Sequence, residues 1–121
     1  MVIAAAAALV VAAVATSAGA RGESREIRLV ARGMSFYLEA DPATANPTIT
    51  LRAGERVRIV LHNETPGIDH DLAAASLGLG LTPVGVGQVT ASDFDVPEQR
   101  GRHEYVCRPH AAMMKGVIEV R

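Results

Sequence analysis

Apolar and polar residues alternate with a period of two along most of the chain after residue 25. In residues 56–61, Val57, Ile59 and Leu61 alternate with two arginines, which is typical of a strand with one buried face. Residues 27–31 show the same alternation, and further strands are predicted at 34–39, 48–52, 88–96, 102–107 and 116–121. Turn-forming Gly, Pro and Asn residues separate these segments. Many short strands at this spacing predict an all-β fold, an antiparallel sandwich or barrel.

Residues 72–87 depart from this pattern, because they are rich in Ala, Gly and Leu without a period of two. We expect a long loop here, with at most one helical turn at Ala73–Ser76, since the later glycines disfavour a longer helix. Its apolar side chains are expected to cover the open end of the sandwich: Leu77, Leu79, Leu81, Val84 and Val86.

The first twenty residues form a separate segment without charge. An unbroken apolar run, Val2–Ala15, is followed by a small-x-small pattern at Ala18 and Ala20. This predicts a secretory signal over residues 1–20, cleaved after Ala20, although no Lys or Arg precedes the run. The alternative is an uncleaved membrane anchor, since about 20 apolar residues span a bilayer. Either way, one domain at 21–121 is expected in the periplasm or another extracytoplasmic space.

Charge and cysteine content exclude several classes of protein. The formal net charge is −1, from 12 Lys and Arg against 13 Asp and Glu, whereas nucleic-acid binders usually carry a basic surface. A single cysteine excludes a disulfide scaffold, a four-thiolate zinc site and a cysteine-bound iron–sulfur cluster.

The candidate chemistry lies near the end of the chain. Cys107, His110 and the pair Met113-Met114 place a thiolate, an imidazole and a thioether within eight positions, between two predicted strands. His70 follows another predicted strand upstream. Two imidazoles and one thiolate, with a weak distant thioether, suit both oxidation states of copper. Zinc also accepts His and thiolate ligands.

These residues resemble the cupredoxins, the small blue (type 1) copper proteins of the plastocyanin/amicyanin type. The resemblance covers about residues 32–121 and rests on three marks: Asn63…His70, Gly101-x-His103-x-Tyr105-x-Cys107, and Cys107-x-Pro109-His110 followed by Met-x-Gly. It implies a Greek-key sandwich of about eight strands and one type 1 copper ion. It also implies that His70, Cys107 and His110 are the equatorial ligands.

The axial ligand has two candidates. Amicyanin-like loops place the methionine three residues after the histidine, which selects Met113, whereas the family's Met-x-Gly step into the last strand selects Met114. We favour Met114, because strand register is harder to alter than the length of a loop. Met113 would then lie at the surface near the edge of His110.

The chain departs from the family pattern at three positions. Asp71 and Arg108 stand where Asn and Ser or Thr are common. We hypothesise that they form a charge-assisted pair between the two ligand segments; the alternative is two solvated charges. His103 shares a strand face with Tyr105 and Cys107. It is interpreted as a hydrogen-bonded core histidine rather than a fifth ligand.

The resemblance implies single-electron transfer between a redox protein donor and acceptor. The alternative is a periplasmic protein that binds and delivers copper. We expect a monomer, and the net charge of −1 argues against a nucleic-acid partner. An enzyme is not expected, because a cysteine nucleophile would need an oxyanion hole and an orienting residue, and no motif supplies them. The docking port for partners is expected around the edge of His110, at Ala111, Ala112, Met113, Gly78, Leu79 and Pro83.

Overall fold

The computed structural model describes residues 24–121, so the predicted signal or anchor at 1–20 lies outside the described residues. The regular structure in this range is nine strands and two short 3-10 turns. In chain order they are β1 (Arg25–Arg32), β2 (Ser35–Leu38), β3 (Ile49–Leu51), β4 (Arg56–Asn63), β5 (Ala73–Ala74), η1 (Ala75–Leu77), β6 (Leu79–Gly80), β7 (Val89–Asp95), β8 (Gly101–Val106), η2 (Arg108–His110) and β9 (Lys115–Val120).

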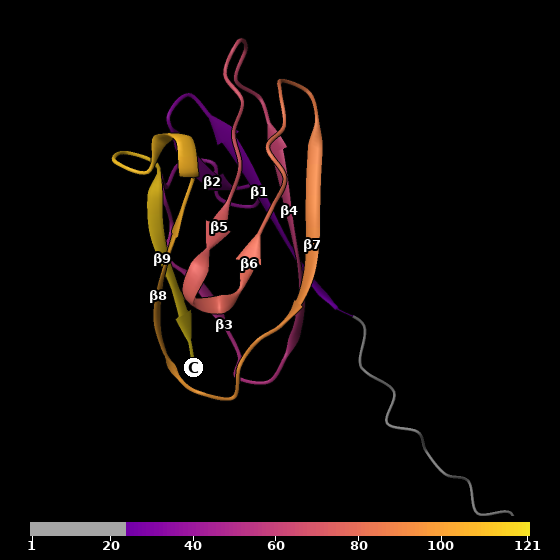
Figure 1. The fold of residues 1–121 in the computed structure, drawn as a ribbon, viewed down its shortest axis with the longest axis vertical. Coiled ribbons are helices and arrows are strands. Elements are labelled where there is room, and N and C mark those ends of the chain that lie inside the picture. Colours follow the sequence, from indigo (N-terminus) through magenta and orange to yellow (C-terminus); the bar gives the residue numbers. More distant parts are fainter. Residues whose placement is uncertain (1–23) are drawn as a thin grey trace, which may run out of the picture.

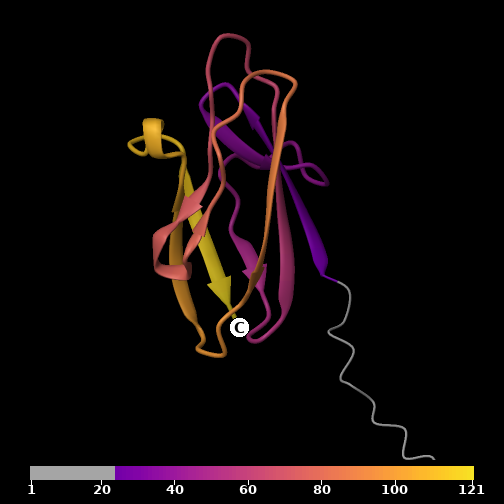
Figure 2. The ribbon, with the colours of Figure 1, turned by 45° about the vertical axis from the view of Figure 1, so that its right-hand side comes forward.

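The strands form two facing sheets (Figures 1 and 2). One sheet has the order β2-β1-β4-β7 and the other has the order β3-β9-β8-β5-β6, which confirms the all-β sandwich. The predicted antiparallel arrangement is only partly correct, because β1 pairs with β4, and β3 with β9, in parallel. Alternation reports which face of a strand is buried and carries no information about the direction of its neighbour.

The core lies between the sheets and follows the predicted alternation. Val57, Ile59 and Leu61 on β4 are completely buried, whereas Arg56 and Arg58 point outward and pair with aspartates on β7. The aromatic ring of Tyr105 packs edge-on against Phe36. These contacts make the two sheets a rigid support for the loops at their ends.

Residues 72–87 contain regular structure that their composition does not predict. β5 and β6 form an antiparallel hairpin that extends the second sheet beyond β8, so the expectation of a loop alone was wrong. Strands of two residues are too short to show a period. The helical turn lies at Ala75–Leu77 rather than at Ala73–Ser76, and it ends at Gly78, whose φ of 67° favours glycine.

The expected apolar cover is also only partly present. Leu79 and Leu81 are buried, with 4% and 2% of their surface exposed, whereas Val86 is 53% exposed. The buried pair packs in the core instead of covering an open end. Within residues 24–121 no helix is long and apolar enough to cross a membrane.

Candidate metal centre

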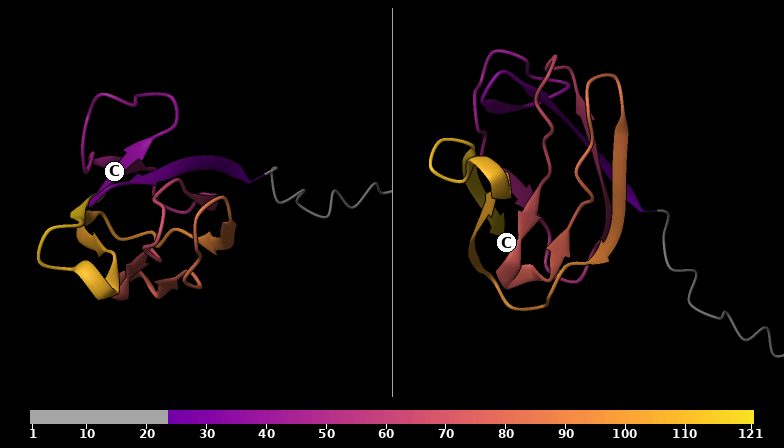
Figure 3. Two further views of the ribbon diagram at one scale, coloured as in Figure 1. Left: turned by 90° about the horizontal axis from the view of Figure 1, so that it is seen from above. Right: turned by 45° about the horizontal axis from the view of Figure 1, so that its top comes forward.

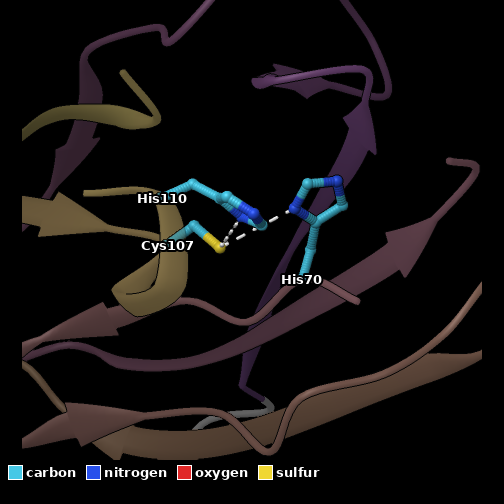
Figure 4. Close-up of side chains that lie close together, drawn as sticks. All are labelled: His70, Cys107 and His110. Atoms are coloured by element: carbon cyan, nitrogen blue, oxygen red, sulfur yellow. Dashed lines mark hydrogen bonds between the residues drawn. The ribbon is translucent and has the colours of Figure 1, made fainter. Parts of the chain in front are cut away.

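Three of the predicted ligands come together where the loop after β8 meets the connection after β4 (Figure 4). Figure 3 shows the loop after β8, with its helical turn, as the yellow-orange segment. The ligand atoms of His70, Cys107 and His110 all lie within 4.8 Å of one another. The Cys107 Sγ is 3.7 Å from Nδ1 of His70 and 3.5 Å from Nδ1 of His110. His70 and Cys107 are fully buried, while His110 is half-buried. The result is a compact site that reaches the surface only through His110.

The loop after β8 turns back on itself and brings Cys107 and His110 to the same point. The His110 N–H donates to the Cys107 carbonyl (3.0 Å), and the Met114 N–H donates to the His110 carbonyl (2.9 Å). The Cys107 N–H donates to the Met114 carbonyl (2.9 Å), which closes the loop. Pro109 suits the first turn of η2, because its φ is already helical. These backbone hydrogen bonds hold the two ligand residues in one closed loop.

His70 comes from the long connection after β4 and is held by backbone hydrogen bonds. Its N–H donates to the Val84 carbonyl (3.0 Å), and the Val84 N–H donates to the His70 carbonyl (2.9 Å). The side chain of Asn63 is fully buried and donates to the carbonyls of Ile68 (2.7 Å) and Val84 (2.8 Å). The sequence marked Asn63 only as part of a motif. Its role as the hub of this loop needed the fold, because both acceptors are backbone groups.

Burial sets the charge state of the metal-free site. Burial lowers the pKa of His70, and the neighbouring His110 lowers it further, although the backbone at Gly33 opposes this shift. Burial also raises the pKa of the Cys107 thiol. The metal-free site therefore favours a neutral imidazole and a protonated thiol. A metal ion must displace the thiol proton to bind, which makes its affinity pH-dependent.

The two methionines differ sharply in exposure. Met114 is fully buried and packs in the core cluster, whereas 58% of Met113 is exposed. This is the placement that the strand register predicts. The exposed Met113 lies in the segment next to His110, where a surface contact could form.

Asp71 and Arg108 form the hypothesised pair. Both oxygens of the Asp71 carboxylate accept hydrogen bonds of 2.7 Å, Oδ1 from the Arg108 backbone N–H and Oδ2 from Arg108 Nε. The Arg108 Nη2 donates to the Leu81 carbonyl (2.9 Å). Only 2% of the Asp71 side chain is exposed, compared with 54% of Arg108. The alternative of two solvated charges is therefore wrong for Asp71, and the pair joins the two ligand segments.

Two other expectations need correction. His103 is hydrogen-bonded, as predicted, through its Nδ1 to the Ser76 hydroxyl (2.8 Å), but it is half-buried rather than in the core. At this position β8 lies beside the η1 turn, which carries Ser76, and His103 is not part of the core cluster that contains Tyr105. The expected port also loses one member, because Leu79 is buried.

The donor set fits copper. Two imidazole nitrogens and one thiolate sulfur satisfy both Cu(II) and Cu(I), and here they converge without a fourth strong ligand among the described residues. The family of copper-binding proteins described as plastocyanin/azurin matches residues 43–121. The chain belongs to this family. Copper is accordingly the cofactor, and the cluster of His70, Cys107 and His110 could hold one ion, as in type 1 sites.

Similar solved structures support the same fold. Rusticyanin from Thiobacillus ferrooxidans is 22% identical, with a TM-score of 0.60, over 83% of this chain and 79% of that one. The metal-binding domain of the Streptococcus pneumoniae Cu(I)-exporting P-type ATPase CopA, solved with Cu(I), is 28% identical, with a TM-score of 0.60, over 79% and 84%. The multicopper oxidase McoA from Aquifex aeolicus is 14% identical, with a TM-score of 0.63, over 80% of this chain but 26% of that one. No curated protein matches the chain in sequence.

Proposed function

We propose that this protein is a mononuclear blue copper protein that carries single electrons between redox partners outside the cytoplasm. The observation that carries the proposal is the closed, hydrogen-bonded loop that holds Cys107 and His110 beside the buried His70. A site whose ligands are already in place rearranges little when the charge of its ion changes, and this lowers the barrier to electron transfer.

The proposed equatorial ligands are the two Nδ1 atoms of His70 and His110 and the Sγ of Cys107, with Met114 as the axial ligand. When bound, copper supplies the one-electron couple. The residues of the chain hold the ligand atoms in place and exclude water, since His70, Cys107 and Met114 are all buried. Met113 is a poor axial candidate because more than half of it faces solvent.

We propose the half-buried His110 as the point where electrons enter and leave. Ala111, Ala112 and Met113 are exposed and follow it directly, so they offer an apolar surface to a redox partner. With a net charge of −1, long-range steering is weak, and partner choice must depend on local contacts. We further propose that the protein is a monomer and that residues 1–20 export it. N-terminal sequencing of the mature protein from an extracytoplasmic fraction would check whether this segment is removed.

Copper delivery is the second candidate function. Its support is the 28% identity to the domain of a Cu(I) exporter that binds Cu(I). A delivery site must release its ion readily, and an open site with exposed ligands does this best. The burial of His70 and Cys107 therefore favours the electron carrier.

The deciding experiment is the visible absorption spectrum of the purified protein titrated with Cu(II), before and after a reductant. An electron carrier gives an intense thiolate-to-copper band that bleaches on reduction and returns on oxidation. The Cys107→Ser variant should bind copper without that band. A nearly colourless wild-type complex that transfers copper to a chelator would support delivery instead.

The axial assignment has its own matched test. Met114→Leu should raise the reduction potential, because losing a thioether donor destabilises Cu(II) more than Cu(I). Met113→Leu is the control and should leave the potential unchanged. A shift in Met113→Leu alone would assign the axial position to Met113.

A further inference from the structure

Thr65 lies in the loop after β4, beside the side of the His70 ring that faces away from Cys107. Its side chain is buried, with 7% of the residue exposed. Its Oγ1 is 3.2 Å from Nε2 of His70, whereas the other ring nitrogen, Nδ1, faces the Cys107 sulfur. The hydroxyl therefore contacts the one ring nitrogen that is not available to a metal ion.

The surroundings of this hydroxyl determine the direction of its hydrogen bonds. The same Oγ1 lies 3.3 Å from the Ala31 carbonyl and 3.4 Å from the Gly33 carbonyl. Carbonyl oxygens only accept hydrogen bonds, and a hydroxyl has a single proton. If that proton pointed at His70, two oxygen lone pairs would face Oγ1 with no hydrogen between them. The proton therefore goes to one of these carbonyls, and Oγ1 accepts from the ring.

The tautomer of His70 follows from this direction. A neutral imidazole carries one N–H, and a hydrogen bond accepted by Thr65 places it on Nε2. The lone pair on Nδ1 then points toward the Cys107 sulfur and His110, without a proton to displace.

Thr65 is itself fixed in place. Its backbone N–H donates to Oδ1 of Asn63 at 2.7 Å, and Asn63 is the buried hub of the same loop. Thr65 thus connects the His70 ring, through its hydroxyl, to the end of β1. Its backbone N–H ties it to the Asn63 hub. Rotation of the ring would break this chain of hydrogen bonds.

We propose that Thr65 is a positioning residue that selects the Nε2–H tautomer and the orientation of His70, so that Nδ1 is ready to bind the ion. This inference rests on the proposed copper site and deepens it. Partners of this kind, on the far nitrogen of a ligand histidine, orient the ring and raise its basicity.

The first test uses the metal-free protein and does not depend on electron transfer. A long-range proton–nitrogen NMR spectrum reports which ring nitrogen carries the proton, and comparison with His70→Gln assigns the signals to this ring. The expected result is a proton on Nε2. A proton on Nδ1 would overturn the inference while leaving the visible-spectrum test of the proposed function untouched.

The second test compares variants of the hydroxyl by Cu(I) affinity against a competing chelator. Thr65→Val should weaken binding by about 10-fold to 100-fold, the usual effect of losing such a partner. The Thr65→Ser variant, which keeps a hydroxyl, should bind Cu(I) with an affinity within about threefold of the wild type. Thr48→Val, at an exposed threonine, should leave the Cu(I) affinity unchanged. A folded Thr65→Val variant with wild-type affinity for Cu(I) would refute the proposal. Circular dichroism checks the fold, and if this variant does not fold, the NMR result decides alone.

Discussion

Replacing Asp71 with alanine should destabilise the metal-free protein more than any comparable change at the surface. The carboxylate is 2% exposed and accepts two hydrogen bonds of 2.7 Å from Arg108. Alanine leaves the Arg108 backbone N–H without this acceptor in a part-buried position. It also removes a tie between the segments that carry His70 and Cys107.

The two bonds contribute unequally. A hydrogen bond involving a charged group contributes about 1.5–3 kcal/mol, and the bond from the backbone N–H counts in full because it is shielded from water. The bond from the guanidinium counts for only about 0–1 kcal/mol, because 54% of Arg108 is exposed and water can replace its partner. The free energy of unfolding should therefore fall by about 1.5–4 kcal/mol.

Urea unfolding of the metal-free protein measures this change directly. The slope of the unfolding free energy against urea should stay constant, which shows that stability alone has changed. The matched control is Asp95→Ala, since Asp95 also pairs with an arginine, at 3.0 Å, but is 69% exposed. Its loss should stay below about 1 kcal/mol. Equal losses in the two variants would refute the claim that the buried geometry of Asp71 matters.

Three further predictions follow from other contacts. Asp71→Asn should raise the reduction potential by tens of millivolts, because a nearby negative charge favours Cu(II). About 1 kcal/mol of this interaction corresponds to about 40 mV for one electron. Protein-film voltammetry measures the potential, and an unchanged value would mean that Arg108 cancels the charge. Gly116→Ala should lower the melting temperature and the free energy of unfolding, the latter by about 1–3 kcal/mol or more. The reason is that the new Cβ would overlap the Tyr105 ring, much closer than van der Waals contact allows. An unchanged melting temperature would contradict this packing. Glu55 has a pKa below its ordinary value, chiefly because Arg25 donates hydrogen bonds to it. The ionised carboxylate therefore stabilises the fold at any pH above the ordinary pKa. This stabilisation is lost as the pH falls through the lowered pKa of the folded state. The difference in unfolding free energy between the wild type and Glu55→Gln should therefore shrink from pH 7 to pH 3, and a constant difference would exclude this linkage.

The sandwich and most of the metal centre could be predicted because their signals are local. The alternation of Val57, Ile59 and Leu61 depends only on which side of one strand is buried. The short spacing of Cys107 and His110 depends only on one loop, and the family motif extends that reasoning to His70. The pairing of Asp71 with Arg108 also follows from two motif positions that face each other.

What could not be predicted depends on contacts between segments far apart in the chain. β5 and β6 are two residues long. β5 becomes a strand because the edge of β8 offers it a partner, and β6 does so because it pairs with β5. Leu79 lies in a segment whose composition is typical of a surface loop, but the β5–β6 hairpin places its side chain in the core. For the same reason, the sequence alone could not show that Leu79 is absent from the docking port.

By itself, the sequence determined the donor chemistry: one thiolate, the imidazoles and the thioethers, and the strand faces that carry them. Only the tertiary structure decided which atoms of those groups face one another. It buries Met114 and exposes Met113, and it surrounds the Thr65 hydroxyl with two carbonyls. The physical reason is that a residue's type sets what it can donate or accept. Burial and the direction of hydrogen bonds come from neighbours that only the folded chain brings within reach.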